Sequence, residues 1–347
     1  MGESTQVLVI GGGPAGSTAA GLLAKQGMQV TLLESATFPR YHIGESILPS
    51  VLPVLDLLGV REKIDNYGFV RKNGAYFEWG PENWDLNFNH LTGAGGYSYQ
   101  VVRSEFDRIL LDNAAELGVD VRQSVKVTDI AFDQGRPVSA SWVRTADRAV
   151  TGEISFDFLI DASGRGGVMA TKYLKNRRYQ EAFRNIAVWS YWRGVAPLDR
   201  GPEGAIAVCS VPYGWFWAIP LHDGTHSVGL VAKRTTFVEE RDRLGGIDKV
   251  YFDALAQCPR VAGMVEGAKR LTDFKVEQDY SYTSESFSGP GYLMIGDAAC
   301  FLDPLLSTGV HLATFSALLG AAAISAVVEG DVSEEEATAF FDGCGSF

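Results

Sequence analysis

The first 34 residues contain a glycine-rich turn between two apolar segments. A β-branched run at residues 6–10 is followed by "GGGPAGS", by the helix-like "TAAGLLAKQG", and by a second strand-like segment that ends at Glu34. Gly11, Gly13 and Gly16 have the G-x-G-x-x-G spacing that, with a strand before it, a helix after it and an acid about twenty residues on, is typical of a dinucleotide-binding βαβ unit. The sequence therefore predicts a Rossmann-like α/β fold.

Each position of this turn has a physical role in such a unit. Gly11 permits the tight turn, Gly13 lets the backbone approach a pyrophosphate, and Gly16 lets the helix pack against the strand. The helix N-terminus offers free N–H groups and a positive dipole end to the phosphates. Glu34 can accept hydrogen bonds from the ribose hydroxyls. The alternative is a glycine turn without a nucleotide. Because no second fingerprint follows, we infer one dinucleotide.

Two later stretches indicate which dinucleotide is bound. "FLIDASGRGG" is a buried strand that runs into a glycine turn with Asp161 at its mouth. "GYLMIGDAACFLDPLLSTGVHLA" has an apolar strand, then Asp297, then a turn through Pro304 and Gly309 into a long helix. Asp297 is placed to hold a ribityl chain, and a helix N-terminus near Gly309 would stabilise negative charge on a reduced flavin. These features predict FAD.

The segment "YGWFWAIP", residues 213–220, has three large aromatic side chains between a glycine and a proline. In a strand, Trp215 and Trp217 share one face, while Phe216 and Ala218 take the other. Since proline cannot donate to a ladder, the strand should end or bend at residue 220. Without further context such a run predicts a core strand.

Together these stretches resemble the FAD-binding monooxygenase superfamily, and within it the flavin-dependent halogenases. Residues 214–220 satisfy the pattern G-W-x-W-x-I-P of that family. "FPRYHIGESILPS" (38–50) is similar to the strap over the flavin, "VVRSEFDRILLDNA" (101–114) to the flavin-contacting helix, and "DASGR" (161–165) to the turn of the family. The resemblance extends from residue 5 to about 330.

The resemblance implies a Rossmann-like FAD-binding domain with an inserted mixed β-sheet substrate domain, the fold of aromatic hydroxylase-like flavoproteins. At 347 residues the chain exceeds what one compact domain usually holds. We expect FAD-binding segments at 1–80, 101–175 and 286–347, and substrate-domain segments at 81–100 and 176–285.

In such enzymes a separate reductase supplies FADH2, and O2 and chloride or bromide give hypohalous acid that travels to a separate substrate pocket. Trp215 and Trp217 would then keep the substrate away from the flavin. By motif match, the lysine that binds hypohalous acid or captures it as a haloamine is Lys72, in "FVRKNGAYFEWG". Aromatic neighbours make its burial credible, and burial would lower its pKa.

The residues matched for FAD contact lie in all three FAD-binding segments and, for Asp279, in the substrate-domain segment 176–285: Gly11, Gly13, Pro14, Ala15, Gly16, Glu34, Ser46, Arg103, Val127, Asp161, Asp279, Asp297, Pro304 and Gly309. Asp279, in "VEQDYSYTSE", resembles a position near the flavin where the cofactor can be attached covalently, although other members carry the aspartate without that bond.

"LLSTGVH" matches the serine-threonine-glycine turn of the family, which assigns halide binding to the amides of Thr308 and Gly309. In the tryptophan-halogenating branch a glutamate precedes this triplet, where this chain has Leu306. The difference favours a phenol or pyrrole, free or carrier-tethered, in natural-product biosynthesis such as that of antibiotics. That branch usually continues past the long helix, whereas this chain ends at "FFDGCGSF", so we expect a truncated chain or an unusually open pocket.

Charge and cysteine content exclude several classes of protein. The net charge of −12 argues against nucleic acid or an anionic membrane as main partner. The four cysteines show no C-x-x-C spacing, and the histidines are not at metal-ligand spacing, so neither a disulfide framework nor a metal is predicted. Together with the absence of a secretory signal at the N-terminus, this favours the cytoplasm. Residues 309–330 are almost long enough to span a bilayer, but their polar and small side chains favour a buried helix.

Two alternatives to a two-component halogenase stay open. A single-component aromatic hydroxylase would oxidise NAD(P)H on its own and would need no lysine. A flavin-binding protein without catalysis would neither oxidise NAD(P)H nor make hypohalous acid. No nicotinamide-binding domain is visible in the sequence, which favours a separate reductase.

Overall fold

A central parallel sheet organises the larger part of the molecule in the computed structural model, which describes residues 2–92, 95–278 and 281–345. β1 (Glu3–Ile10) pairs in parallel with β2 (Val30–Glu34) and with β10 (Thr151–Asp161). The order continues through β7 (Asp120–Gln123) on one side and β20 (Tyr292–Met294) and β19 (Ser288–Gly289) on the other. A hairpin, β8 (Val125–Asp133) and β9 (Arg136–Arg144), extends the sheet from β10.

Alternate residues of β1 belong to two different apolar layers. Val7 and Val9 pack with α1 (Pro14–Lys25) and α9 (Gly309–Glu329), whereas Leu8 and Ile10 pack under the β8–β9 hairpin. Burial on both faces explains why residues 7–10 of this strand form a continuous apolar run. Because the glycine turn follows β1 directly, the two layers fix its position and that of the N-terminus of α1.

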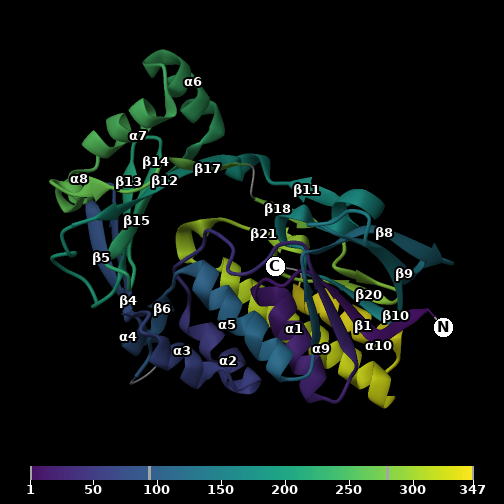
Figure 1. Ribbon diagram of the computed structural model, residues 1–347. Helices are drawn as coiled ribbons and strands as arrows, with labels where there is room; N and C mark the ends of the chain where they lie inside the picture. The colour runs from purple at the N-terminus through teal and green to yellow at the C-terminus, as the bar shows by residue number, and fades with distance from the viewer. Residues whose placement is uncertain (1, 93–94, 279–280, 346–347) are drawn as a thin grey trace.

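A second sheet forms the upper left part of Figure 1. Its order is β16-β12-β15-β14-β13-β4-β5, and β17 also pairs with β12. The bounds are β4 (Gly74–Trp79), β5 (Glu82–Asn87), β12 (Asn185–Arg193), β13 (Ile206–Val211), β14 (Gly214–Pro220), β15 (Thr225–Lys233), β16 (Lys269–Arg270) and β17 (Lys275–Gln278). β4 pairs in parallel with β13, so residues 74–79, assigned from the sequence to an FAD-binding segment, belong to this sheet.

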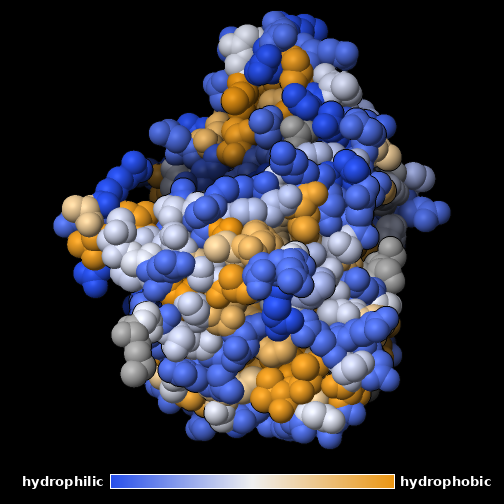
Figure 2. Space-filling view, turned by 90° about the vertical axis from the view of Figure 1, so that its right-hand side faces the viewer, coloured by the Kyte–Doolittle hydropathy of each residue, from blue (hydrophilic) through white to orange (hydrophobic). Residues whose placement is uncertain are grey.

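Three helices cover the outer face of the second sheet: α6 (Arg234–Leu244), α7 (Ile247–Ala256) and α8 (Pro259–Val265). Phe216 and Ala218 pack beneath these helices, whereas Trp215 and Trp217 belong to an apolar cluster on the opposite face. The expected alternation along this strand is confirmed, and the strand ends at Pro220 as expected. Figure 2 shows a recess between the narrower upper part of the molecule and its wider body.

The remaining elements connect or flank the two sheets. They are α2 (Leu52–Leu58), α3 (Arg61–Tyr67), β3 (Val70–Lys72), α4 (Phe88–Thr92), β6 (Ser98–Gln100), α5 (Arg103–Glu116), β11 (Arg177–Tyr179), β18 (Tyr282–Ser284), β21 (Cys300–Phe301) and α10 (Glu334–Gly345), with short helical turns between them. β11, β18 and β21 form a small sheet of their own, and β3 pairs with β6.

α9 is long and apolar enough to cross a membrane by length and composition, a test that the core helix of a soluble protein also passes. Ala313, Ala317 and Ala321 are buried in the same cluster as residues of α1 and β1. Along this face α9 is therefore a core helix, as the sequence predicts.

The close approach of α1 to the glycine turn gives a testable prediction. A Cβ on Gly16 would lie 1.9 Å from the carbonyl oxygen of Gly11, so Gly16→Ala must displace the backbone. We expect it to lower the free energy of unfolding by about 2 kcal/mol or more. The matched control is Gly263→Ala in α8, where a Cβ meets nothing within 4 Å and alanine should be neutral or stabilising. Equal thermal stability of the two variants would contradict this packing.

Candidate active site

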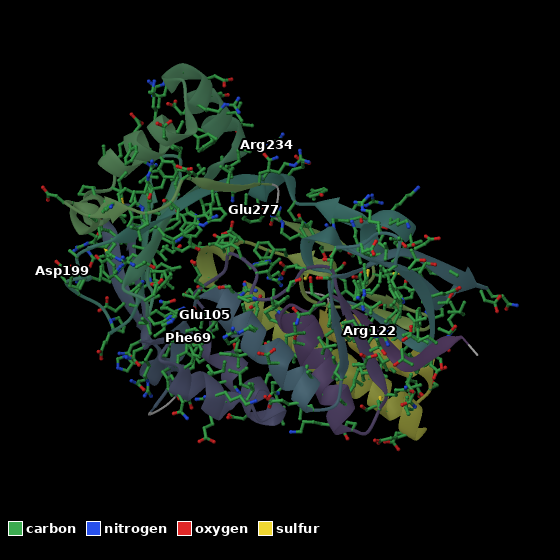
Figure 3. All side chains as sticks on the ribbon, viewed as in Figure 1. Phe69, Glu105, Arg122, Asp199, Arg234 and Glu277 are labelled. Atoms are coloured by element: carbon green, nitrogen blue, oxygen red, sulfur yellow. The ribbon has the colours of Figure 1, made fainter. Side chains whose placement is uncertain are left out.

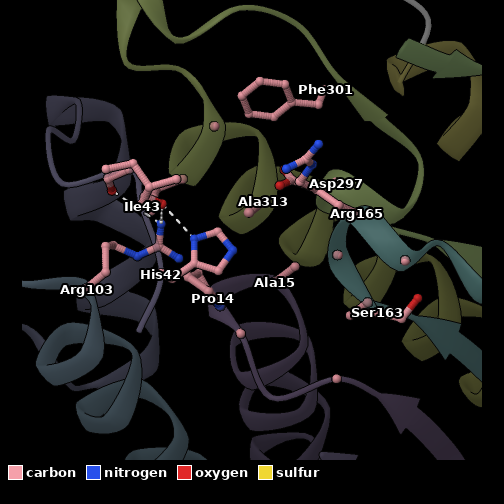
Figure 4. Close-up of a pocket in the computed structure, with 18 of the residues that line it drawn as sticks. Pro14, Ala15, His42, Ile43, Arg103, Ser163, Arg165, Asp297, Phe301 and Ala313 are labelled. Atoms are coloured by element: carbon pink, nitrogen blue, oxygen red, sulfur yellow. Dashed lines mark hydrogen bonds between the residues drawn. The ribbon is translucent and has the colours of Figure 1, made fainter. Parts of the chain in front are cut away.

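A cavity of about 570 Å³ lies between the two sheets. Its walls come from the glycine turn, the segment 38–50 (the strap), the start of α5, the turn after β10 and the start of α9. Figure 4 shows Pro14, His42, Arg103, Asp297 and Phe301 around this space. Segments far apart in the sequence thus meet at the carboxyl ends of the parallel strands, where open α/β sheets bind ligands.

Most residues predicted to contact FAD line this cavity: Gly11, Gly13, Pro14, Ala15, Glu34, Ser46, Arg103, Val127, Asp297, Pro304 and Gly309. Trp215 and Trp217 line it as well, whereas Gly16, Asp161, Lys72 and Thr308 are not among its lining residues. Asp279 lies outside the described residues.

The glycine turn has the geometry that its spacing predicts. Gly11 has φ of +105°, in the region that favours glycine. Glu34 is buried, and its Oε2 and Oε1 accept hydrogen bonds of 2.7 Å from the amides of Gly12 and Ala36. The carboxylate thus fixes the turn beside the cavity that it also lines, and its contact with a ribose stays a prediction.

Arg103 holds the strap in place. Its Nε and Nη2 donate to Asp107 at 2.8 and 3.0 Å, and its Nη1 donates to the carbonyl of Ile43 at 2.9 Å. Arg40 contacts the same carboxylate at 3.2 Å and lies against Gly13 in the cavity wall. Its guanidinium is suited to a pyrophosphate, a role that the sequence analysis missed although "FPRY" places a cation in the strap.

Two aspartates at the ends of strands have different surroundings. Asp161 is fully buried, and its carboxylate accepts hydrogen bonds from the amides of Ser163 and Met169 at 3.0 and 2.7 Å. It therefore closes its own turn instead of facing the cavity. Asp297 does line the cavity, where burial raises its pKa to about 6 against the opposing charges of Arg103, Arg165 and Arg177.

An ion pair closes the rim of the cavity on the side of the second sheet. Arg165 pairs with Glu277 of β17 and also donates to the carbonyl of Gln278 at 2.7 Å. Figure 3 shows Glu277 between the second sheet and the body of the molecule. Both partners line the cavity, so this contact joins the two sheets over it.

The turn before α9 contains the residues predicted to bind halide, and this role stays a prediction. Ser307 adopts φ of +60°, and α9 begins at Gly309 with Thr308 as the residue before it. The first N–H groups of a helix have no partner within the helix, and Gly309, the first residue of α9, lines the cavity. Leu306, at the position where a glutamate is expected in the tryptophan-halogenating branch, is 59% exposed.

Three indoles form a wall on the cavity side of the second sheet. The ring centroid of Trp217 lies 6.0 Å from that of Trp215 and 6.2 Å from that of Trp189. Trp217 Nε1 donates to Ser227 Oγ at 3.1 Å, and Trp189 Nε1 donates to the hydroxyl of Tyr41 at 2.8 Å. These hydrogen bonds fix the orientation of the rings. The sequence analysis missed Trp189, which only strand pairing brings into the wall.

Lys72 is 1% exposed on β3, and its Nζ donates to the carbonyl of Ile47 in the strap at 3.2 Å. The ring of Phe88 lies 5.3 Å from the same nitrogen. Burial lowers the pKa of Lys72 to about 7. The burial and direction of the shift agree with the expectation from its aromatic neighbours. The amine lies behind the strap residues that line the cavity, because it reaches Ile47 and not the cavity itself.

The chain matches the family model described as tryptophan halogenase over residues 6–96 and 87–342. It belongs to the flavin-dependent halogenase family. Among curated relatives, it is 47% identical over 343 residues to a tryptophan 2-halogenase of Chondromyces crocatus and 41% identical over 357 residues to a sulochrin halogenase of Aspergillus terreus. These alignments cover 99% and 96% of this chain but only 65% of either relative.

Solved halogenase structures share the fold. The chondrochloren halogenase CndH, described as an FAD-dependent halogenase, superimposes with a TM-score of 0.91 at 37% identity, over 98% of this chain and 78% of that chain. The flavin-dependent halogenase CmlS gives 0.90 at 39% identity, over 99% of this chain and 62% of that chain. The expected fold, a Rossmann-like domain with a mixed β-sheet insertion, is confirmed.

The buried amine of Lys72 predicts a pH-dependent stability. Its pKa is lower in the folded than in the unfolded chain, so the free energy of unfolding should rise as pH rises from about 7 toward the ordinary pKa of 10.5. Lys72→Met removes this effect, and its advantage over the unsubstituted protein should reach a few kcal/mol at or below pH 7 and shrink as pH rises. Denaturant titrations between pH 6 and about 10 measure the difference. The control is Lys63→Met, which changes an exposed side chain. Its free energy of unfolding should differ from that of the unsubstituted protein by the same amount at every pH.

Proposed function

We propose that this chain is the FAD-binding, hypohalous acid-forming part of a two-component halogenase. The proposal rests on one observation: the strap separates the indole-lined cavity from the buried amine of Lys72. The strap residues Glu45 and Ser46 face a cavity walled by indoles, whereas the carbonyl of Ile47 binds the buried amine of Lys72. A hydroxylase transfers oxygen directly to a substrate at the flavin and has no use for a buried lysine behind the strap.

The cavity residues fit FAD. A Cβ on Gly11 or Gly16 would collide with backbone atoms at 2.3 or 1.9 Å, so this cradle requires glycines. Among the described residues, Ser46 Oγ is buried in the cavity wall without a hydrogen-bond partner, which suits a polar cofactor edge. Gly13, Arg40 and the start of α1 would hold the pyrophosphate, and Asp297 the ribityl chain. Bound and reduced, FAD supplies the two electrons that activate O2.

The wall of Trp189, Trp215 and Trp217 is proposed to exclude the aromatic substrate from the flavin. The amides of Thr308 and Gly309 are proposed to bind chloride or bromide. Lys72, neutral in part near pH 7, would receive the hypohalous acid and direct it to the substrate. A separate flavin reductase is the proposed source of FADH2.

For the substrate we propose an electron-rich aromatic, a phenol or pyrrole, free or tethered to a carrier. The exposed Leu306 supports this, since it offers no base to help a less activated ring lose its proton. A second candidate is an indole, because the relative that is 47% identical is named a tryptophan 2-halogenase. Competition among a phenol, a pyrrole and tryptophan, read by mass spectrometry, separates these classes.

Bromination by the purified protein tests the proposed function. We expect brominated phenol or monochlorodimedone only when FAD, NADH, bromide, O2 and a generic flavin reductase are all present. Lys72→Met should lose at least about 100-fold of this activity while retaining FAD, and Lys63→Met should lose none. Hydroxylated product, or NADH oxidation without the reductase, would instead establish a hydroxylase. Flavin binding with neither activity would favour a silent flavoprotein.

Attachment of FAD through Asp279 is a separate proposal on the same cofactor. If the bond forms, denaturing precipitation should leave yellow colour in the pellet, and Asp279→Asn should release all of it. The neighbouring variant Gln278→Asn is the control and should retain the colour. Complete release of flavin from the unsubstituted protein would contradict covalent attachment.

A further inference from the structure

A chain of hydrogen bonds runs from the cavity to the surface beside the strap. Glu45 lines the cavity and is 2% exposed, and the hydroxyl of Tyr191 donates to its Oε1 at 2.5 Å. The hydroxyls of Tyr191 and Tyr41 lie 3.0 Å apart. Tyr41 is 50% exposed, so the chain begins at an enclosed carboxyl and ends at a residue in contact with solvent.

The hydrogen bonds at the outer end of this chain allow Tyr41 to act as the donor to Tyr191. Trp189 Nε1 donates to the hydroxyl oxygen of Tyr41 at 2.8 Å. This bond occupies an acceptor position of Tyr41 and leaves its hydrogen free to be donated to Tyr191. Tyr191 in turn donates to Glu45, so all hydroxyl hydrogens can point from the surface toward the cavity.

The groups that face Glu45 come from several elements. They are Tyr191 of β12, Ser227 of β15, Arg103 of α5 and Asp223 of the turn between β14 and β15. Ser227 accepts from Trp217 Nε1, and its own hydroxyl stabilises the ionised carboxylate, as do Tyr191 and Arg103. Burial outweighs these effects and raises the pKa of Glu45 to about 7, with a smaller contribution from Asp223. Glu45 can therefore gain and lose a proton near neutral pH.

The reaction proposed above needs a proton that must enter the cavity. An aromatic RH, a halide, FADH2, O2 and one proton give the halogenated aromatic, FAD and two molecules of water. One proton is consumed in each turnover, and the chain of hydroxyls beside the strap connects solvent with the cavity wall at Glu45.

We propose that Tyr41, Tyr191 and Glu45 form the proton relay that supplies the cavity from solvent, an inference that rests on the proposed function. Glu45 gives its proton to the cavity, the hydrogen of Tyr191 moves to Glu45, the hydrogen of Tyr41 moves to Tyr191, and water restores Tyr41. The shift is concerted because a partly desolvated phenolate is unfavourable: desolvation raises the pKa of both tyrosines, that of Tyr41 to about 12.

Three isosteric substitutions interrupt the relay without removing a ring or a large volume: Glu45→Gln, Tyr191→Phe and Tyr41→Phe. We expect turnover to fall at least about tenfold in the first two and less in the third, where water can reach Tyr191. The matched control is Tyr251→Phe in α7. The hydroxyl of Tyr251 is buried away from the cavity and donates to the carbonyl of Val228 at 3.2 Å. Titration with FAD should give the same affinity for all four variants.

The pH profile separates a relay from a structural role. Glu45 must be protonated to donate, so turnover of the unsubstituted enzyme should fall as pH rises through about 7. In Glu45→Gln the rate should be low and should lack this limb. Small acids such as imidazolium should restore part of the rate in Glu45→Gln and none in Tyr251→Phe.

A second readout needs no turnover. Infrared difference spectra of the resting protein between pH 6 and about 8 should contain a carboxyl band that titrates near neutral pH, that Glu45→Gln removes and that Tyr191→Phe shifts. The absence of such a band overturns the relay, as do Glu45→Gln and Tyr191→Phe enzymes with unchanged turnover and pH profile. Failure of the proposed function has a different signature: the unsubstituted protein with its reductase gives no halogenated product, whatever the infrared spectra show.

Discussion

The buried guanidinium of Arg103 fixes the strap, and the rest of the site depends on it. It pairs with Asp107 through two hydrogen bonds and donates to the carbonyls of Ile43 and Gly44. Loss of one partner of a buried ion pair typically lowers the free energy of unfolding by about 3–5 kcal/mol. Loss of Arg103 or Asp107 should therefore strongly destabilise the fold. Because Arg103 donates to backbone carbonyls, it fixes the path of the strap backbone more than the positions of the strap side chains.

Consecutive residues of the strap face two different environments. Glu45 and Ser46 line the cavity, while the carbonyl of Ile47 faces Lys72. The same physical cause, removal from water, lowers the pKa of the lysine and raises that of the carboxyl, and both shifts end near 7. An amine on one side of the strap and a carboxyl on the other, both with a pKa shifted to about 7, form an arrangement typical of catalytic sites.

The two faces of β14 in the second sheet have different surroundings. One face packs Phe216 beneath helices and is structural, while the other presents Trp215 and Trp217 to the cavity. Trp217 and Trp189 are held by Ser227 and Tyr41, which also belong to the surroundings of Glu45. The indole wall and the relay therefore share hydrogen bonds, so a change in one affects the other.

The sequence by itself determined the βαβ unit, the strand with alternating tryptophans and the cofactor class. These follow from local spacing: glycines at Gly11, Gly13 and Gly16 permit a backbone that other residues clash with, and period-two alternation sorts side chains between faces. It also placed the lysine in an apolar segment that could bury it. Such features need only the neighbours along the chain.

Only the tertiary structure decided which residues face one another across the cavity. Trp189 lies outside the matched motifs, and Arg40 and Glu45 lie in the strap without a role assigned from the sequence; they reach the cavity because the strap and β12 meet there. Asp161 looks like a cofactor ligand in the sequence, yet its carboxylate is used by its own turn. Likewise β4 joins the second sheet through pairing with β13, a contact between residues more than a hundred positions apart. Long-range pairing and desolvation, which set both shifted pKa values, depend on the whole fold and have no signature in a short stretch of sequence.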